Sequence, residues 1–143
     1  MLTVNDLMTV EPLTVALHAT LRDVIQLMKL EACRQLPVVD DAGRLVGMIT
    51  DRDVRLAMNS PFVLHERWQD ETLLDTAMAE SCMTPNPLTV TPDTPAYRAA
   101  EMLSAYKFGA LPVVENGELV GIISVTDYLD HFAAERPEVV GTL

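Results

Sequence analysis

The hydrophobic residues of this chain follow the same order of spacings twice. In each half, apolar residues first recur three and four positions apart and then gather in two short runs. The helical spacings cover residues 21–28 and 96–103, and the short runs cover residues 36–39, 45–49, 111–114 and 119–123. The first pattern predicts a helix with one buried face, and short runs rich in β-branched residues predict buried strands. Each half therefore predicts a helix followed by two strands.

The residues themselves repeat along with the pattern. The matching segments are MTVEPLTV (8–15) with MTPNPLTV (83–90), LPVV (36–39) with LPVV (111–114), and GRLVGMIT (43–50) with GELVGIIS (117–124). Residues 13–15 and 88–90 predict a short strand before each helix, and the turn residues at 40–43 and 115–117 predict a tight connection between the two later strands. A last helix is expected after Thr50 and Ser124. Each copy therefore reads as β-α-β-β-α.

The start of the first helix in each copy is predicted by residue type. Thr20 and Thr94 are suited to cap these helices, because a hydroxyl oxygen can accept a hydrogen bond from an unpaired amide of the first turn. Pro95 suits the first turn, where its missing N–H costs nothing.

Two copies in one chain predict a single module of the α+β class with a pseudo-twofold axis. A unit of about 55 residues exposes one apolar sheet face, so two copies bury these faces most economically against each other. We expect the first repeat at 1–58, a linker at 59–81, and the second repeat with a C-terminal tail at 82–143. The linker is expected to be partly helical and packed on the module, because its apolar residues share one helix face. These residues are Leu73, Leu74, Ala77 and Met78.

The net charge narrows the choice of partners. At −11 the chain repels the phosphate backbone of nucleic acids, and no stripe of Lys or Arg offsets this charge, so binding to DNA or RNA is not expected. The few cations gather in the first repeat, which leaves room for small phosphate ligands. They are Arg22, Lys29, Arg34, Arg44, Arg52 and Arg55, against Arg98 and Lys107 in the matching part of the second repeat.

The sequence carries no membrane, metal or catalytic signature. No apolar stretch approaches the roughly 18 residues of a membrane span, and no basic start precedes an apolar run, so a cytoplasmic protein is expected. Cys33 and Cys82 form neither a CxxC pair nor, with the three histidines, a zinc spacing, so both thiols are expected to pack in the core. No GxSxG or GxxxxGK[ST] motif occurs. We therefore predict no enzyme activity, no metal site and no required cofactor.

The order MT-x-x-P-L-T-V, helix, LPVV, turn, G-x-L-V-G-x-I-[ST]-x-x-D resembles that of CBS (cystathionine-beta-synthase) domains, and it occurs twice. The resemblance covers about residues 2–132, and it is closest to free-standing bacterial CBS-pair proteins without an attached enzyme or transporter. Members of this family bind AMP, ADP, ATP or another adenosyl compound in two clefts between the repeats. The resemblance therefore implies an adenosine-type regulatory ligand for this chain.

The resemblance assigns ribose binding to the [ST]-x-x-D segments, which here begin at Thr50 and Ser124 and end at Asp53 and Asp127. A carboxylate can accept hydrogen bonds from two neighbouring ribose hydroxyls, while the hydroxyl side chain and the helix N-terminal amides suit phosphate oxygens. A second interpretation stays open at this point. Ser or Thr followed three residues later by an acid is also close to a capping box, and one residue set can serve both roles.

The resemblance further implies that each cleft combines the [ST]-x-x-D segment of one repeat with the segment before the first strand and the residues before LPVV of the other repeat. The first cleft would contain Thr50 and Asp53 facing Thr84, Leu88, Phe108 and Gly109, and the second would contain Ser124 and Asp127 facing Thr9, Leu13, Cys33 and Arg34. Phe108 is expected to lie against adenine, and Arg34 or Arg52 to meet phosphate. The alternatives are an ordinary core position for Phe108 and solvated surface positions for the two arginines.

Two functions follow from the sequence. The first is a sensor, in which an adenosine nucleotide shifts the arrangement of the repeats and an unidentified regulated protein responds to the change. The second is a ligand-independent dimerisation or scaffold protein with vestigial clefts. The resemblance also implies a homodimer assembled through the CBS repeats. The intact Asp53 and Asp127 favour the sensor.

Overall fold

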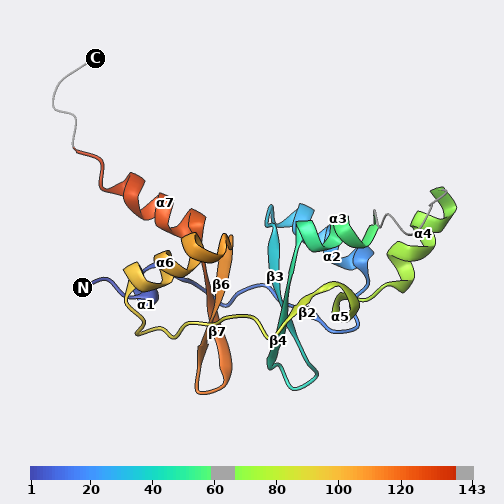
Figure 1. Ribbon diagram of the computed structural model, residues 1–143, viewed down its shortest axis with the longest axis horizontal. Helices are drawn as coiled ribbons and strands as arrows, with labels where there is room; N and C mark the ends of the chain where they lie inside the picture. Colours follow the sequence, from blue (N-terminus) through green and yellow to red (C-terminus); the bar gives the residue numbers. More distant parts are fainter. Residues whose placement is uncertain (59–66, 138–143) are drawn as a thin grey trace, which may run out of the picture.

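The computed structural model describes residues 1–58 and 67–137, which form two small sheets side by side with helices packed on them (Figure 1). Residues 59–66 of the expected linker and residues 138–143 of the expected tail lie outside the described residues. The helices are α1 (Val4–Leu7), α2 (Leu21–Leu30), α3 (Asp51–Met58), α4 (Arg67–Thr76), α5 (Ala79–Cys82), α6 (Ala96–Tyr106) and α7 (Val125–Ala134). The strands are β1 (Thr9–Val10), β2 (Val15–Ala16), β3 (Gln35–Val39), β4 (Leu45–Thr50), β5 (Thr84–Pro85), β6 (Ala110–Glu115) and β7 (Glu118–Ser124).

The two antiparallel hairpins predicted from the repeated runs form the centre of the sheets. β3 pairs with β4 and β6 with β7, and both ladders shift register near the end of the LPVV segment. The Asp40 carboxylate closes the first turn by accepting hydrogen bonds from the amides of Ala42 and Arg44. Gly43 and Gly117 have positive φ angles of 79° and 81°, which glycine adopts without steric cost. The turn residues therefore act as the sequence predicts.

The predicted short strand before the first helix differs between the repeats. In the first repeat β2 pairs in parallel with β3, and the Leu17 amide continues the ladder by donating to the Val39 carbonyl. In the second repeat the pairing shrinks to one bridge between Val90 and Val113. The residue matching Leu17 is Pro92, which has no N–H to donate. The expected strand at 88–90 is therefore reduced to a single residue.

Each repeat receives one outer strand from the N-terminal segment of the other repeat. β1 lies antiparallel to β7, and β5 lies antiparallel to β4. The sheet orders are thus β2-β3-β4-β5 and β1-β7-β6. In Figure 1 the chain runs from α1, beside α6, across to the first repeat and later returns. This exchange brings residues from the start of each repeat against the last strand of the other repeat.

Two separate hydrophobic cores lie under the helices. The first is built by α2, α3, β3 and β4, and Ala79 of α5 is fully buried in it. The second is built by α6, β6 and β7, and it includes Val4 of α1, which is fully buried as well. The predicted helix faces are confirmed, because Leu21, Val24 and Met28 of α2 are buried. Two β-α-β-β-α repeats of the α+β class are therefore observed.

The caps of the two matching helices differ from each other. Thr20 caps α2 as predicted, since its side chain accepts a hydrogen bond from the Asp23 amide. The prediction that Thr94 caps α6 was wrong. The Thr94 hydroxyl instead accepts from the Thr91 amide within the preceding turn, and Pro95 stands at the cap position.

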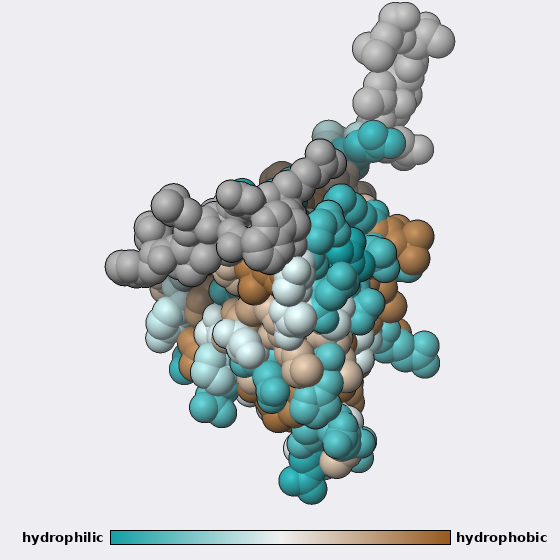
Figure 2. Space-filling view, turned by 90° about the vertical axis from the view of Figure 1, so that its right-hand side faces the viewer, coloured by the Kyte–Doolittle hydropathy of each residue, from teal (hydrophilic) through white to brown (hydrophobic). Residues whose placement is uncertain are grey.

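Helix α4 of the expected linker packs beside α2. Arg22 of α2 bonds to Asp75 and Glu71 of α4, each at 2.6 Å. Figure 2 views this end of the molecule and shows hydrophilic and hydrophobic side chains intermingled over its described part. Leu74 and Ala77 pack against the first core, while Met78 is 37% exposed. The boundaries at residues 58 and 82 stay predictions.

Among the described residues, no helix combines the length and the apolar character needed to cross a membrane.

Candidate functional site

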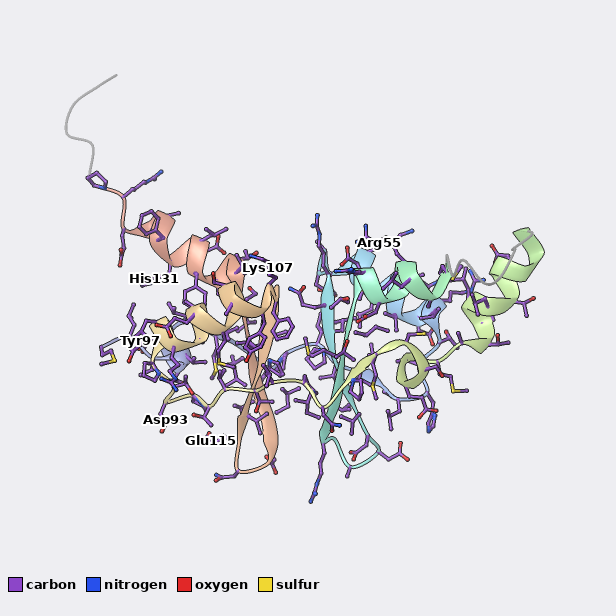
Figure 3. All side chains as sticks on the ribbon, in the orientation of Figure 1. Arg55, Asp93, Tyr97, Lys107, Glu115 and His131 are labelled. Atoms are coloured by element: carbon purple, nitrogen blue, oxygen red, sulfur yellow. The ribbon has the colours of Figure 1, made fainter. Side chains whose placement is uncertain are left out.

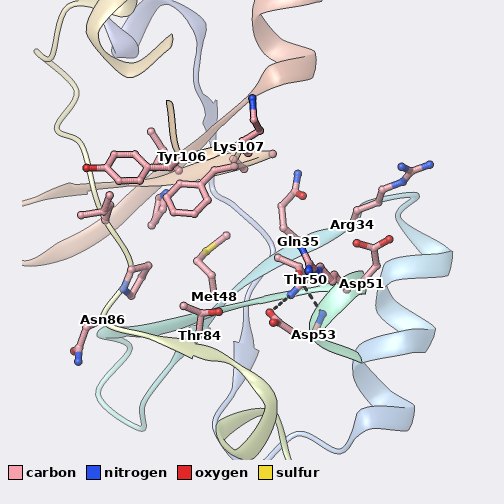
Figure 4. A pocket seen from close by; sticks show the side chains of 18 of the residues that line it. Arg34, Gln35, Met48, Thr50, Asp51, Asp53, Thr84, Asn86, Tyr106 and Lys107 are labelled. Carbon is pink, nitrogen blue, oxygen red and sulfur yellow. Dashed lines mark hydrogen bonds between the residues drawn. The ribbon is translucent and has the colours of Figure 1, made fainter. Parts of the chain in front are cut away.

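A cleft of about 710 Å³ lies between the two repeats, where the N-terminus of α3 faces β5 and the end of α6. Its volume is within the range of about 300 to 1,000 Å³ that small-molecule sites occupy. Every residue that the sequence assigned to the first cleft lines it. These residues are Thr50, Arg52, Asp53, Thr84, Leu88, Phe108 and Gly109. Figure 4 shows side chains from both repeats around this space.

Asp53 is held in place by the start of α3. One of its carboxylate oxygens, Oδ2, accepts a hydrogen bond from the Thr50 amide at 2.9 Å, and the Asp53 amide donates to the Thr50 hydroxyl at 3.1 Å (Figure 4). This reciprocal pair is the capping box that the sequence left open as an alternative. The other oxygen, Oδ1, has no hydrogen-bond partner among the described residues. Asp53 therefore caps the helix and keeps one oxygen available at the edge of the cleft.

The opposite wall of the cleft is aromatic. The rings of Tyr106 and Phe108 are stacked, with centroids 5.5 Å apart and planes inclined by 14°. Phe108 is 40% exposed, so it is not the ordinary core residue of the alternative interpretation. Phe108 follows Lys107, whose φ of 60° ends α6 in the left-handed region and turns the chain into β6. A flat ring facing a carboxylate across a cleft suits a ligand with an aromatic base and a hydroxylated sugar.

The second [ST]-x-x-D segment has the same capping box, but the second carboxylate oxygen of its aspartate has a hydrogen-bond partner. The Ser124 amide donates to Asp127 Oδ2 at 2.8 Å, and the Asp127 amide donates to the Ser124 hydroxyl at 3.2 Å. Here the Thr9 hydroxyl also donates to Asp127 Oδ1, at 3.3 Å. Thr9 and Asp127 therefore meet as the sequence predicted, and their contact takes up the oxygen that is unpartnered in Asp53.

Arg34, Cys33 and Leu13 are the other residues expected in the second cleft. Arg34 lines the first cleft, beside Asp51 in Figure 4. Cys33 packs against the first core and lines a separate, shallower hollow of about 380 Å³ between α2 and α3. Leu13 is 44% exposed. The expected position of Arg34 beside Ser124 and Asp127 stays a prediction, and the structure shows it at the first cleft.

Several cleft residues were missed by the sequence argument. Tyr106, Lys107, Gln35, Met48 and Asn86 also line the cleft. Tyr106 could have been found, because it stands two positions before Phe108, which the sequence had assigned to the cleft. Gln35 lies close to Gly109, where an added Cβ would come within 2.8 Å of the Gln35 Oε1 atom. That contact crosses between the repeats, and local sequence does not report it.

The two thiols lie in surroundings that suppress their reactivity. Burial raises the pKa of the Cys33 thiol, and burial together with the negative charge of Asp53 raises the pKa of the Cys82 thiol. A raised pKa keeps a thiol protonated, and the thiol form is a poor nucleophile and metal ligand. Among the residues that the structure describes, no group of three or more His, Cys, Asp or Glu side chains could hold a metal ion.

Comparison with known proteins gives the family. The model of the CBS domain matches twice, at residues 4–60 and 79–134. A CBS domain-containing protein of Dictyostelium discoideum is 35% identical over 128 residues, which cover 89% of this chain and 88% of the relative. The chain therefore belongs to the CBS domain family and carries a tandem pair of these domains.

Solved structures share the fold over nearly the whole chain. CBSX2, a CBS-pair protein from Arabidopsis thaliana, was solved in complex with AMP; it is 30% identical, with a TM-score of 0.79 and coverage of 96% of this chain and 100% of that chain. The CBS domain pair of protein MJ0100 was solved with 5'-methylthioadenosine and S-adenosyl-L-methionine; it is 25% identical, with a TM-score of 0.77 and coverage of 95% and 99%. These CBS pairs thus bind adenosine-type ligands.

Other relatives are longer than this chain. It is 34% identical to part of an inosine-5'-monophosphate dehydrogenase from Bifidobacterium longum, but the match spans only 21% of that enzyme. The match covers only a minor part of the enzyme, so it does not indicate catalysis by this chain.

Proposed function

We propose that this chain is a regulatory module that binds an adenosine nucleotide in the cleft between its two repeats. The observation that carries the proposal is the position of Asp53, whose Oδ1 oxygen is unpartnered among the described residues and borders a cleft with an aromatic wall. A partly buried carboxylate that faces a ligand-sized space is suited to accept hydrogen bonds from ribose hydroxyls. The AMP complex of CBSX2 and the adenosyl complexes of MJ0100 support the same ligand class.

The cleft offers a distinct surface for each part of the ligand. The exposed ring of Phe108, stacked on Tyr106, would lie against adenine. Asp53 would bind the ribose from the opposite side. Thr50, the α3 amides and Arg52 would face the 5' substituent, because the N-terminus of a helix favours negative charge. No catalytic step is assigned to these residues, and we propose a sensor without enzyme activity.

Calorimetry and thermal melting test this function directly. The chain would be titrated with AMP, ADP, ATP and S-adenosyl-L-methionine, with GMP as the base control. A ligand present at about 100 times its dissociation constant adds about 2.7 kcal/mol to the stability of the folded state, which is readily seen as a melting shift. We expect adenosine compounds to bind with micromolar affinity and GMP to bind more weakly. Absence of heat and of a melting shift with every adenosine compound at millimolar concentration would leave the scaffold function as the better account.

We also propose that the signal passes through a homodimer to a regulated protein. Asp53 and Asp127 lie in the first turns of α3 and α7, so a change at either aspartate is coupled to the position of a helix. Three apolar residues of α7, namely Val125, Leu129 and Phe132, are 42%, 62% and 76% exposed. Apolar side chains exposed along one helix face are typical of a surface that a partner covers.

A further inference from the structure

The two clefts of this chain are chemically unequal, although the repeats that form them share one fold. Positive φ angles fall at matching positions, Ala32 with Lys107 and Glu11 with Asn86, which shows that the backbones correspond residue by residue at the cleft edges. Differences in residue type at matching positions therefore translate into differences between the clefts. The clefts differ in the charge of their lining, in their aromatic side chains and in whether Oδ1 of the aspartate has a hydrogen-bond partner.

Charge distinguishes the clefts most strongly. The first cleft is lined by three cations, Arg34, Arg52 and Lys107, and by two anions, Asp51 and Asp53, so it has a small positive excess. The counterparts of Arg52 and Lys107 are Thr126 and Ala32. Acids stand instead at other matching positions of the second cleft: Glu11 for Asn86, Glu31 for Tyr106 and Asp130 for Leu56, in addition to Asp127. Arg34, which matches Gly109, is the one cation among these counterparts, so the acids outnumber it. In a chain with a net charge of −11, a cationic cleft is a local exception that favours an anionic ligand.

The aromatic side chains and the unpartnered aspartate oxygen also belong to the first cleft. The stacked pair Tyr106 and Phe108 belongs to the first cleft, and its counterparts are Glu31 and Cys33. Cys33 is directed to the core and to the hollow between α2 and α3. Asp127 Oδ1 accepts the Thr9 hydroxyl, whereas Asp53 Oδ1 has no partner among the described residues. The second cleft would have to break an internal hydrogen bond to bind ribose.

We infer that the first cleft is the nucleotide site of this chain, that it selects ligands carrying a phosphate group over the uncharged nucleoside, and that the second cleft takes no nucleotide. Figure 3 shows Lys107 at the inner end of α6, and Figure 4 shows Lys107 and Arg34 on different sides of the cleft. Cations from both repeats thus border the space where a 5' phosphate would extend from a ribose on Asp53. This inference rests on the proposed adenosine function and specifies its ligand class and its stoichiometry.

Calorimetric titration with AMP and with adenosine tests the inference. For the native chain we expect one AMP per chain and a dissociation constant for AMP at least about tenfold lower than for adenosine, since several charges act on the phosphate. The double variant Arg52→Thr with Lys107→Ala gives each position the residue of the other repeat, and Ala32 shows that alanine is accepted at the left-handed position. We expect this variant to lose most of the preference for AMP, about fivefold or more for the exposed charges removed.

A matched control separates a local effect from the overall charge. Arg44→Thr removes one positive charge in the β3–β4 turn, away from the cleft, and should leave the preference for AMP within error of the native value. Two AMP molecules per chain, equal affinity for AMP and adenosine, or an unchanged preference in the double variant would each overturn the inference. Those results differ from failure of the proposed function, in which neither AMP nor adenosine binds.

Discussion

At the scale of single residues, the two aspartates show how one side chain serves both stability and recognition. In each repeat, one carboxylate oxygen closes a capping box and fixes the side chain at the N-terminus of a helix. The cap therefore pre-orients the second oxygen, which lowers the entropy that a ligand contact would otherwise cost. The capping and ribose-binding interpretations of the [ST]-x-x-D segment are compatible, because they use different atoms of the same carboxylate.

We expect Asp53→Asn to weaken AMP binding by about tenfold to a hundredfold, because a charge-assisted contact with the ribose hydroxyls is worth about 1.5 to 3 kcal/mol. The melting temperature of the free protein should change little, since an amide is a good capping group. Calorimetry with AMP and melting without ligand measure the two effects separately. A variant that melts lower but binds AMP as before would show that Asp53 only caps α3.

Asp127→Asn is the matched change in the other repeat. Because Asp127 Oδ1 already accepts the Thr9 hydroxyl, we expect a much smaller loss of AMP affinity than for Asp53→Asn. The stability cost should stay within about 0.5 to 2 kcal/mol, the range for a helix cap. The ratio of the two losses, measured under identical conditions, reports which aspartate holds the ribose. A larger loss from Asp127→Asn would reverse the assignment of the site.

At the scale of elements, the hairpins and the helix faces could be predicted from the sequence, whereas the exchange of outer strands could not. Apolar spacing and turn residues act locally, so the runs ending in Val39 and Val114 gave strands at the expected places. The pairing of β1 with β7 joins residues far apart in the chain, and two-residue strands carry no periodicity to detect. Thr94 failed as a cap because a neighbouring turn competed for its hydroxyl, a choice that residue type alone does not decide.

The exchanged strands depend on glycines at which the backbones approach closely. An added Cβ at Gly121 would lie 2.9 Å from the Thr9 carbonyl oxygen of β1. We expect Gly121→Ala to destabilise the fold by about 1 to 3 kcal/mol, because the backbone of β1 would have to shift. Chemical denaturation measures the loss. Gly117→Asn is the control, since that turn glycine has open space and asparagine tolerates its positive φ angle; an equal loss in both variants would contradict the close-approach explanation.

The attachment of α4 to α2 should depend on pH. The Arg22 guanidinium lowers the pKa of the Asp75 carboxyl through a direct hydrogen bond. A folded-state pKa below the unfolded value means that this pairing stabilises the folded state above about pH 4 and is lost as the pH falls through the folded pKa. Amide hydrogen exchange of α4 should therefore accelerate on acidification relative to α6, after correction for the intrinsic rates. In Arg22→Ala this extra acceleration should be absent; its persistence would assign it to other groups.

At the scale of the whole molecule, the repeat determines the architecture, and residue differences between the two copies make the two clefts different. The architecture of two β-α-β-β-α repeats was predictable, because the residue pattern occurs twice, but each repeat builds a separate hydrophobic core under its own helices. Which cleft is open was not predictable, because it depends on contacts across the axis. The Thr9 hydroxyl, for example, takes up Asp127 Oδ1 because β1 pairs with β7 of the second repeat.

The remaining apolar surface leads to a prediction about assembly. Val125, Leu129 and Phe132 lie at helical spacing on α7 and are exposed. A row of exposed apolar residues on α7 suits a symmetric interface, in which a second copy presents the same surface. We expect the native chain to sediment as a dimer at micromolar concentration.

Leu129→Glu and Phe132→Glu should each shift this dimer toward monomer, because a carboxylate buried in an apolar contact loses its hydration without gaining a partner. Thr126→Glu adds the same charge to α7 off the apolar stripe and should leave the dimer intact, so it controls for the added charge itself. Sedimentation velocity over a concentration series distinguishes the outcomes.

If the native chain were only monomeric at micromolar concentration, the homodimer would be wrong and the signal would have to pass from the cleft to the regulated protein within one chain. If Thr126→Glu dissociated the dimer as strongly as Phe132→Glu, the interface would depend on charge rather than on the apolar stripe of α7.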